Sequence, residues 1–312
     1  MNNNKNKSEQ YKIITAGSTY LDIDAYACMV AMAELLRLQG ENAIAYSQAP
    51  CNYSICSSLT SNGQILRELP SDISEGSASY IIVDVSDPEF LRSSVPLDRV
   101  EAIYDHHVGF EDYWQKRIGD GARIEFIGAA ATLIYRKWKN AGLQSKMKCS
   151  TAKLLAAAIL DNTLNLTSSN MTDEDSCAFE ELCSIAGIKD SFRAEYFSEV
   201  QKSVEEDLKN AIFGDIKTVR GNKILPPHVA QLAVWNSESI FVRLDEIRTW
   251  FANMTDGWMI NLIDIKEMRS YFICDGANYQ NKICEVFKIR FESGVAKLPC
   301  AYLRKEIIKK TI

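Results

Sequence analysis

Hydrophobic and polar positions in the first half of the chain form short apolar runs separated by longer segments with helical periodicity. Residues 11–16 are an apolar run typical of a strand, and residues 24–39 repeat apolar positions with the period of an amphipathic helix. Further strands are predicted at residues 42–46, 80–83 and 100–104, and further helices at residues 129–141 and 151–160. Strands that alternate with helices favour a parallel α/β sheet.

The pattern changes after a long polar helix predicted at residues 195–212. Beyond it we expect strands at residues 215–219, 229–234, 258–265 and 270–274, with helices around residues 239–253 and 278–287. A chain of 312 residues is long enough for two domains. We therefore predict an α/β protein with an N-terminal parallel-sheet domain over residues 1–202 and a smaller α+β domain over residues 208–312.

Composition narrows the classes of partner. The apolar fraction of 46% and the charged fraction of 24% are those of a soluble globular protein. The net charge of −6 does not favour binding to nucleic acids or anionic membranes, and no apolar run approaches the roughly 20 residues that span a bilayer. Nine cysteines without a Cys-x-x-Cys pair, and a polar leader without a secretory apolar core, predict a cytoplasmic protein.

The histidines and several aspartates suggest a metal centre. Two of the three histidines, His106 and His107, directly follow Asp105 at a predicted strand end. Other acidic candidates near the ends of predicted elements are Asp22, Asp24, Asp84 and Asp161. The carboxyl ends of parallel strands lie at one edge of a sheet, so these groups can converge. Carboxylates with imidazole suit Mn²⁺ or Mg²⁺, and two such ions about 3.5–4 Å apart can hold a hydroxide and polarise a phosphoryl oxygen.

The arrangement of these motifs resembles the DHH phosphoesterase superfamily. The similar segments are Gly17-Ser-Thr-Tyr-Leu-Asp22-Ile-Asp24, Asp84, Asp105-His106-His107, Glu125-Phe-Ile-Gly128, Asp161 and Met171-Thr-Asp-Glu-Asp175. The closer resemblance is to the branch of manganese-dependent (family II) inorganic pyrophosphatases, exopolyphosphatases and prune proteins. It implies a DHH catalytic domain followed by a DHHA2-like domain, and hydrolysis of a phosphoanhydride by a metal-activated hydroxide.

The resemblance also implies a role for each matching residue. The metal ligands, for two Mn²⁺ or Mg²⁺ ions, would be Asp22, Asp24, Asp84, His106 and Asp161, with Asp84 bridging both ions. His107 and Asp105 would be catalytic, with His107 contacting the phosphate or the leaving group. Lys217, Arg304 and Lys305 would bind the phosphates when the domains close. The expected partner is a small phosphate-containing substrate, and a homodimer is left open.

Two departures from the family pattern weaken the pyrophosphatase assignment. The pyrophosphatases carry a ligating histidine where this chain has Ser18, and a serine hydroxyl is a poorer metal ligand. Glu306 stands where they have a cation. These departures leave open a non-catalytic scaffold derived from the family. A phosphodiesterase acting on short oligonucleotides or cyclic dinucleotides is a further alternative, although the Gly-Gly-His segment of that branch is absent.

Simpler structural readings remain for single residues. Asp84 is also placed to cap a helix that begins near Pro88, and Asp161 to cap a turn with Asn162. Arg304 and Lys305 belong to a basic C-terminal run, which is usually a solvated face.

Overall fold

The computed structural model describes residues 11–61, 64–71, 73, 78–92 and 94–312, so the polar leader lies outside it. The chain divides into two compact units, Met1–Phe192 and Arg193–Ile312. The predicted domain limits, residues 1–202 and 208–312, stay a prediction. The helix predicted at residues 195–212 is instead two helices, α6 (Phe192–Glu206) and α7 (Leu208–Gly214).

The first unit is built on a five-stranded parallel sheet with the order β2-β1-β3-β4-β5. Its strands are β1 (Lys12–Thr15), β2 (Ala43–Ala45), β3 (Ser79–Val83), β4 (Val100–Asp105) and β5 (Ala122–Ile124). Strand β3 is buried along its whole length, as its apolar run Tyr-Ile-Ile-Val predicts. The sequence order of the strands reverses between β1 and β3, and ligands of such sheets bind beyond the carboxyl ends of the strands at this point.

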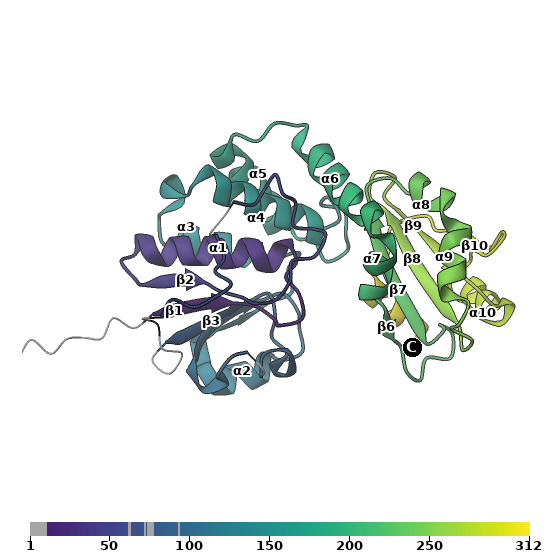
Figure 1. Ribbon diagram of the computed structural model, residues 1–312, viewed down its shortest axis with the longest axis horizontal. Coiled ribbons are helices and arrows are strands. Elements are labelled where there is room, and N and C mark those ends of the chain that lie inside the picture. Colours follow the sequence, from purple (N-terminus) through teal and green to yellow (C-terminus); the bar gives the residue numbers. More distant parts are fainter. Residues whose placement is uncertain (1–10, 62–63, 72, 74–77, 93) are drawn as a thin grey trace, which may run out of the picture. The chain divides into compact units, whose positions relative to one another are not determined.

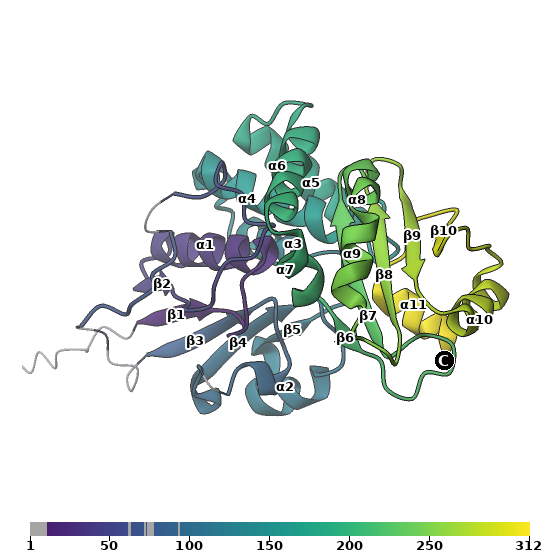
Figure 2. The same ribbon diagram turned by 45° about the vertical axis from the view of Figure 1, so that its right-hand side comes forward.

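Helices cover both faces of this sheet (Figures 1 and 2). Helices α1 (Ile23–Leu38) and α3 (Ala130–Asn140) pack on one face, and α2 (Glu111–Ile118) packs on the other against β4 and β5. Helices α4 (Cys149–Asn162) and α5 (Asp173–Ala186) form a further layer over α1 and α3. Because α1 and α4 are packed between neighbours, most of their side chains are buried.

The second unit contains a mixed five-stranded sheet with the order β10-β9-β8-β7-β6. Its strands are β6 (Lys217–Thr218), β7 (His228–Val234), β8 (Trp258–Asp264), β9 (Arg269–Cys274) and β10 (Val295–Lys297). Only β7 and β8 pair in parallel. The helices that follow α7 are α8 (Glu238–Val242), α9 (Leu244–Phe251), α10 (Ala277–Phe287) and α11 (Arg304–Thr311).

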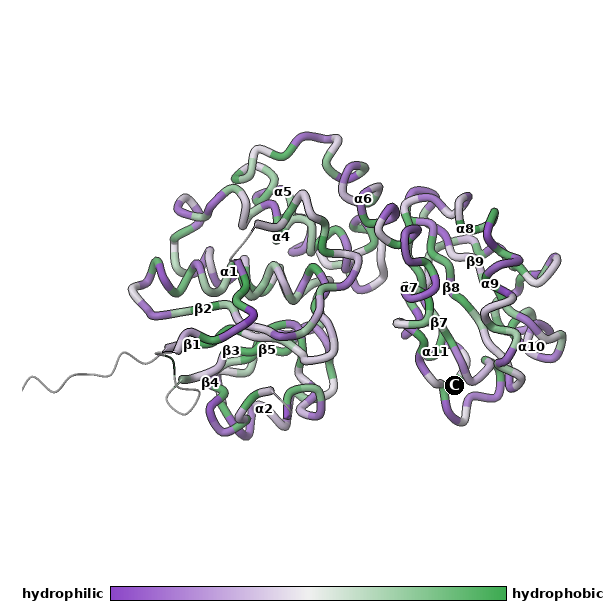
Figure 3. The backbone as a smooth tube through the Cα atoms, in the orientation of Figure 1, coloured by the Kyte–Doolittle hydropathy of each residue, from purple (hydrophilic) through white to green (hydrophobic). Residues whose placement is uncertain are grey.

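The hydrophobic core of each unit follows its sheet. Figure 3 shows hydrophobic residues along the central strands and hydrophilic residues on the outer helices and loops. In the second unit, Met259 and Phe272 of the sheet pack with Ile283 of α10 and Ile307 of α11. No described helix is both long and apolar enough to cross a bilayer. The nine cysteines are free thiols in this structure.

Candidate metal centre

Three aspartates lie at or beyond the carboxyl ends of parallel strands of the first sheet. Asp22 ends the loop after β1 and caps α1, accepting a hydrogen bond from the Ala25 N–H at 2.9 Å. Asp84 directly follows β3, and Asp105 is the last residue of β4. The alternative that Asp84 caps a helix near Pro88 is wrong, because Asp87 caps the short 3-10 turn Pro88–Phe90.

Asp84 lies at the centre of the acidic group. Its backbone has a φ of 58°, a left-handed conformation that costs a residue with a side chain about 1–2 kcal/mol. Such strain collects at functional sites. Its carboxyl group is buried, and burial followed by the neighbouring Asp22, Asp24 and Asp105 raises its pKa well above the ordinary value. Clustered carboxyl groups of this kind require protons or a bound cation.

Asp24, in the first turn of α1, is fully buried, and its carboxylate meets the beginning of helix α3. Its two carboxyl oxygens accept hydrogen bonds from the backbone N–H groups of Ala130 and Ala131, each at 2.8 Å. Burial, and then the charge of Asp22, raise the pKa of Asp24 to about 7 against these hydrogen bonds. Asp24 therefore connects the acidic group to the amino-terminal end of α3, where the helix dipole favours a negative charge.

His106 has the tautomer that a metal ligand needs. Its Nδ1 lies 3.3 Å from the carbonyl oxygen of Ile127, which can only accept a hydrogen bond. The proton is therefore on Nδ1, and the lone pair is on Nε2. This Nε2 atom is 3.5 Å from Oδ1 of Asp84, and the imidazole side chain is only 6% exposed.

His107 is exposed and is held by Asp105, with its Nδ1 3.9 Å from Oδ1 of Asp84. Its side chain is 63% exposed, and its Nδ1 donates a hydrogen bond to Oδ1 of Asp105 at 2.8 Å. The same oxygen accepts the backbone N–H groups of His106 and His107 at 2.7 and 3.1 Å. Although burial opposes protonation, the hydrogen bond to Asp105 and its charge raise the pKa of His107.

The donor atoms at this edge fit a divalent cation. Among the described residues, Asp84, His106 and His107 form the group whose ligand atoms all lie within 4.8 Å of one another. Oδ1 of Asp84 and Oδ2 of Asp105 are buried and have no hydrogen-bond partner in the described part of the chain. Buried carboxylate oxygens beside an imidazole nitrogen match the preferences of Mn²⁺ and, with fewer nitrogens, Mg²⁺.

This group leaves out the predicted metal ligands Asp22 and Asp24, and it also leaves out the fifth predicted ligand, Asp161. It lies half-buried in the last turn of α4, so the alternative of an N-cap for this residue is wrong. The chain then takes three consecutive left-handed residues, Leu164, Asn165 and Leu166. The role of Asp161 as a metal ligand stays a prediction.

Asp175 supports the contact between His106 and Ile127. Its carboxylate is buried, and from the sequence it was recognisable only as part of residues 171–175, a segment that resembles the superfamily. Oδ2 of Asp175 accepts hydrogen bonds from the N–H groups of Gly128 at 2.9 Å and Thr172 at 2.8 Å, and Oδ1 accepts one from the Thr132 hydroxyl at 2.6 Å. Asp175 thus fixes the backbone next to the Ile127 carbonyl. The Thr-x-x-Asp spacing of residues 172–175, a capping box, was the available signal for its local role.

Ser86 is a second supporting residue without a sequence signal. Its hydroxyl donates to the backbone carbonyl of His107 at 2.9 Å, and its own carbonyl accepts from Nε1 of the buried Trp114 at 2.6 Å. Ser18, at the position of the family's histidine, is exposed and donates to the carbonyl of Phe90 at 3.1 Å.

The three predicted phosphate-binding cations lie in the second unit. The guanidinium of Arg304 is buried and forms a bidentate pair with Asp215, with both N–O distances at 2.9 Å. Arg304 and Lys305 begin helix α11, so the reading of this segment as a solvated basic run is wrong for Arg304. Burial, and then the charge of Arg304, lower the pKa of Lys217.

Glu306, the second departure from the family pattern, has a structural role. Its carboxylate accepts a hydrogen bond from the backbone N–H of Leu303 at 2.6 Å and so caps the beginning of α11.

No protein-family model matches the chain. It is similar to proteins named probable manganese-dependent inorganic pyrophosphatase. The one from Staphylococcus haemolyticus is 26% identical over 305 residues, covering 91% of this chain and 92% of the relative. The one from Deinococcus radiodurans is 24% identical over 311 residues, covering 93% and 94%. The resemblance predicted from the motifs is thereby confirmed over most of the chain.

Solved structures confirm the two-domain α/β fold. A protein of Methanococcus jannaschii, described as a candidate family II inorganic pyrophosphatase, superposes with a TM-score of 0.64 at 18% identity and covers 96% of this chain and 99% of its own. An exopolyphosphatase-related protein of Bacteroides fragilis has a TM-score of 0.53 at 12% identity and covers 97% and 90%.

Proposed function

We propose that this relative of the manganese-dependent inorganic pyrophosphatases is a divalent-metal-dependent phosphohydrolase that cleaves phosphoanhydrides such as pyrophosphate or short polyphosphate. The observation that carries the proposal is the group formed by the buried Asp84 and His106 with the exposed His107, at the point where the strand order reverses. The names of the relatives supply the substrate class and the manganese dependence.

The aspartates beyond the carboxyl ends of the strands of the first sheet would supply the metal ligands. Asp84 is the central ligand, since its unpartnered Oδ1 faces Nε2 of His106. Asp22 and Asp24 add the negative charge that raises the pKa of Asp84, and we assign Asp161 to the same ligand set. Bound Mn²⁺ or Mg²⁺ would neutralise these carboxylates and acidify a water molecule so that it can attack phosphorus.

His107 is the proposed proton donor to the leaving phosphate. Asp105 holds its Nδ1–H, so only Nε2 can exchange a proton with a substrate. The exposed imidazole can reach a substrate, whereas the buried Asp105 orients the ring. The phosphate-binding role of Lys217, Arg304 and Lys305 stays a prediction.

An assay of phosphate release tests the proposal. The purified chain with Mn²⁺ or Mg²⁺ is given pyrophosphate, tripolyphosphate and long-chain polyphosphate. We expect metal-dependent release of phosphate from at least one of them, and loss of this release in Asp84→Asn. Release should be unchanged in the control Lys153→Gln, which removes a charge on α4 where the Lys153 ammonium lies over the Phe192 ring. Absence of release from all three substrates, with metal uptake shown by calorimetry, would refute the activity.

The same samples separate the two alternatives. Cleavage of a dinucleotide or cyclic dinucleotide, without release from the anhydrides, would favour the phosphodiesterase. Failure of the wild-type chain to take up Mn²⁺ at millimolar concentration would favour the non-catalytic scaffold.

A further inference from the structure

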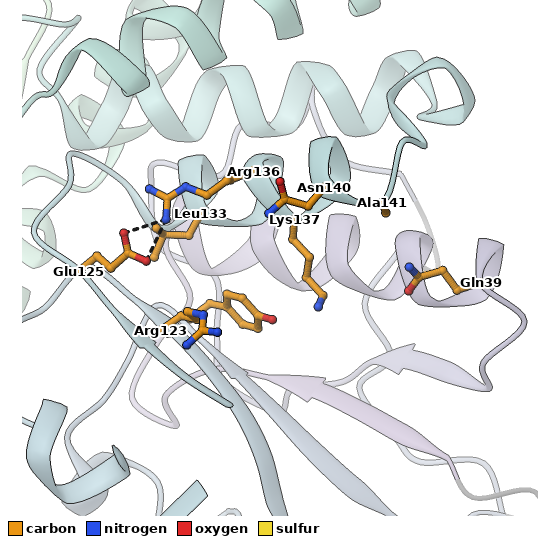
Figure 4. A pocket seen from close by; sticks show the side chains of 9 residues that line it. Gln39, Arg123, Glu125, Leu133, Arg136, Lys137, Asn140 and Ala141 are labelled. Atoms are coloured by element: carbon orange, nitrogen blue, oxygen red, sulfur yellow. Dashed lines mark hydrogen bonds and ion pairs between the residues drawn. The ribbon is translucent and has the colours of Figure 1, made fainter. Parts of the chain in front are cut away.

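A cavity of about 360 Å³ is lined by residues of β4, β5 and α3, and none of its lining residues belongs to the group Asp84, His106 and His107. Figure 4 shows it between the β4–β5 edge of the sheet and helix α3. Tyr104 and Arg123 are register partners on β4 and β5 and line it from the sheet. Leu133 and Lys137 line it from α3, and Gln39 closes one end. Tyr104 immediately precedes Asp105, so the two side chains leave opposite faces of the strand.

The charges of this cavity are unbalanced. One lining cation, Arg136, is neutralised by ion pairs with Glu125 at 2.7 Å and with Glu174 at 2.6 Å. Arg123 and Lys137 make no ion pair with any described residue. Arg123 donates to a backbone carbonyl, that of Ala122, and the Lys137 ammonium lies 5.4 Å from the centre of the Tyr104 ring. A net positive cavity on a chain of net charge −6 is a local attraction for anions.

The remaining lining groups suit a ligand with both a charged and an apolar part. The side-chain amides of Gln39 and Asn140 can donate hydrogen bonds to oxygen, and the Tyr104 ring and Leu133 offer apolar contact. A volume of this size is that of small-molecule sites in proteins. Figure 4 shows the side chains of Arg123 and Lys137 entering the same space from the sheet and from the helix.

We propose that this cavity is a second ligand site, separate from the metal centre, for a small phosphate-bearing molecule whose phosphate is bound by Arg123 and Lys137. Arginine and lysine are the side chains that bind phosphate oxygens through charge-assisted hydrogen bonds. The site stands on the shape and charge of the cavity and does not depend on the hydrolase activity.

The site is placed to influence the metal centre. Glu125, which lines the cavity, donates its backbone N–H to the carbonyl of Asp105 at 3.0 Å. Two residues further on, the carbonyl of Ile127 holds Nδ1 of His106. A ligand that draws Arg136 away from Glu125 would therefore act on a segment that contacts both Asp105 and His106.

Calorimetric titration of the full-length, Mn²⁺-loaded protein tests the site, with inorganic phosphate and glycerol 3-phosphate as probes. We expect Arg123→Gln and Lys137→Gln each to weaken binding by about tenfold or more, since each removes a charge-assisted hydrogen bond. Lys137→Arg keeps the charge and should retain binding. Lys153→Gln is the matched control, because its ammonium also lies over an aromatic ring but outside the cavity.

The two probes distinguish the source of the phosphate group. Equal affinity for both indicates the free anion, whereas preference for glycerol 3-phosphate indicates an organic phosphate. Asp84→Asn should leave this binding unchanged even where it abolishes hydrolysis. The proposal is overturned if neither probe binds at millimolar concentration, or if binding is lost in Asp84→Asn and retained in both cavity variants.

Discussion

The carbonyl oxygen of Ile127 lies 3.3 Å from Nδ1 of His106 and thereby directs the lone pair of the imidazole toward Asp84. The contact joins the segment after β4 to the segment between β5 and α3. Its geometry depends on Gly128, whose backbone N–H is held by Asp175.

Gly128→Ala should disturb this contact. A Cβ atom at this position would lie 2.5 Å from Cγ2 of Thr163 and 2.7 Å from Oδ2 of Asp175, so the backbone or these buried side chains must shift. Overpacking of this kind costs about 1–3 kcal/mol of unfolding free energy. Displacing the partner of a ligating histidine weakens metal binding by about 10–100-fold. Chemical denaturation and Mn²⁺ titration measure the two effects.

Gly214→Ala is the control for that substitution. Gly214 ends α7, where an added Cβ atom would meet no other atom within 4 Å and the backbone is not left-handed. Alanine there should leave Mn²⁺ affinity unchanged and stability unchanged or slightly higher. Equal Mn²⁺ affinities for Gly128→Ala and the wild type would contradict the role assigned to the Ile127 carbonyl.

The metal-free protein should lose stability as the pH rises. The pKa of Asp24 is raised to about 7 and that of Asp84 is raised well above its ordinary value, whereas both ionise near pH 4 in an unfolded chain. Between about pH 4 and pH 7 the folded state therefore binds more protons than the unfolded state, and its stability decreases with pH. Urea unfolding of chelated protein across this range measures the slope.

Asp84→Asn should flatten that slope and raise the stability of the metal-free protein near neutral pH, because it removes one of the clustered carboxylates. Asparagine tolerates the left-handed backbone at this position, so the fold is retained. Added Mn²⁺ should stabilise the wild type and not the variant. Parallel slopes for both chelated proteins would show that Asp84 does not carry the effect.

Ser18→His should increase the affinity for Mn²⁺ and the rate of pyrophosphate hydrolysis. The substitution restores the imidazole that the resemblance places at this position, and imidazole is the stronger ligand. The Ser18 hydroxyl makes an exposed hydrogen bond to Phe90, so its loss should cost little stability. Unchanged affinity and rate would place position 18 outside the metal centre.

Arg304→Gln should destabilise the second unit. It leaves the carboxylate of Asp215 without its bidentate partner and removes a buried guanidinium bond to the carbonyl of Val229. We expect a loss of about 2–4 kcal/mol in unfolding free energy. Lys305→Gln, an exposed neighbour, should change stability by less than about 0.5 kcal/mol. A stable Arg304→Gln variant with weakened substrate binding would instead support the role of Arg304 in phosphate binding.

Elements with a clear apolar pattern were predictable from the sequence. The buried strand β3 and the helix α1 match their predicted positions to within one residue at each end. Helix α2 escaped prediction because Trp114 is the only buried residue among its eight, so it has no apolar stripe to recognise. Strand β5 has only three residues, none of them buried, and its alternation is too short to identify.

The approach of Asp84 to Asp105 was predictable from the topology of the sheet, whereas the contacts that hold the surrounding backbone were not. Asp84 and Asp105 each end a recognisable strand, and parallel strands bring such ends together. The contact of Asp175 with Gly128 joins residues 47 positions apart, and no local pattern indicates it. The bond from His106 to the Ile127 carbonyl likewise depends on a backbone atom, which every residue type carries.

Asp105 bonds both of the histidines that follow it. A single oxygen, Oδ1, receives hydrogen bonds from the backbone of both following residues and from the ring of His107, while His106 is turned inward and His107 outward. These three consecutive residues thus place one imidazole in a buried position and the other in an exposed one. We expect the same Asp-His-His sequence, placed at the end of another parallel strand, to give one buried and one exposed imidazole. This requires a carbonyl group that can accept a hydrogen bond from the buried ring.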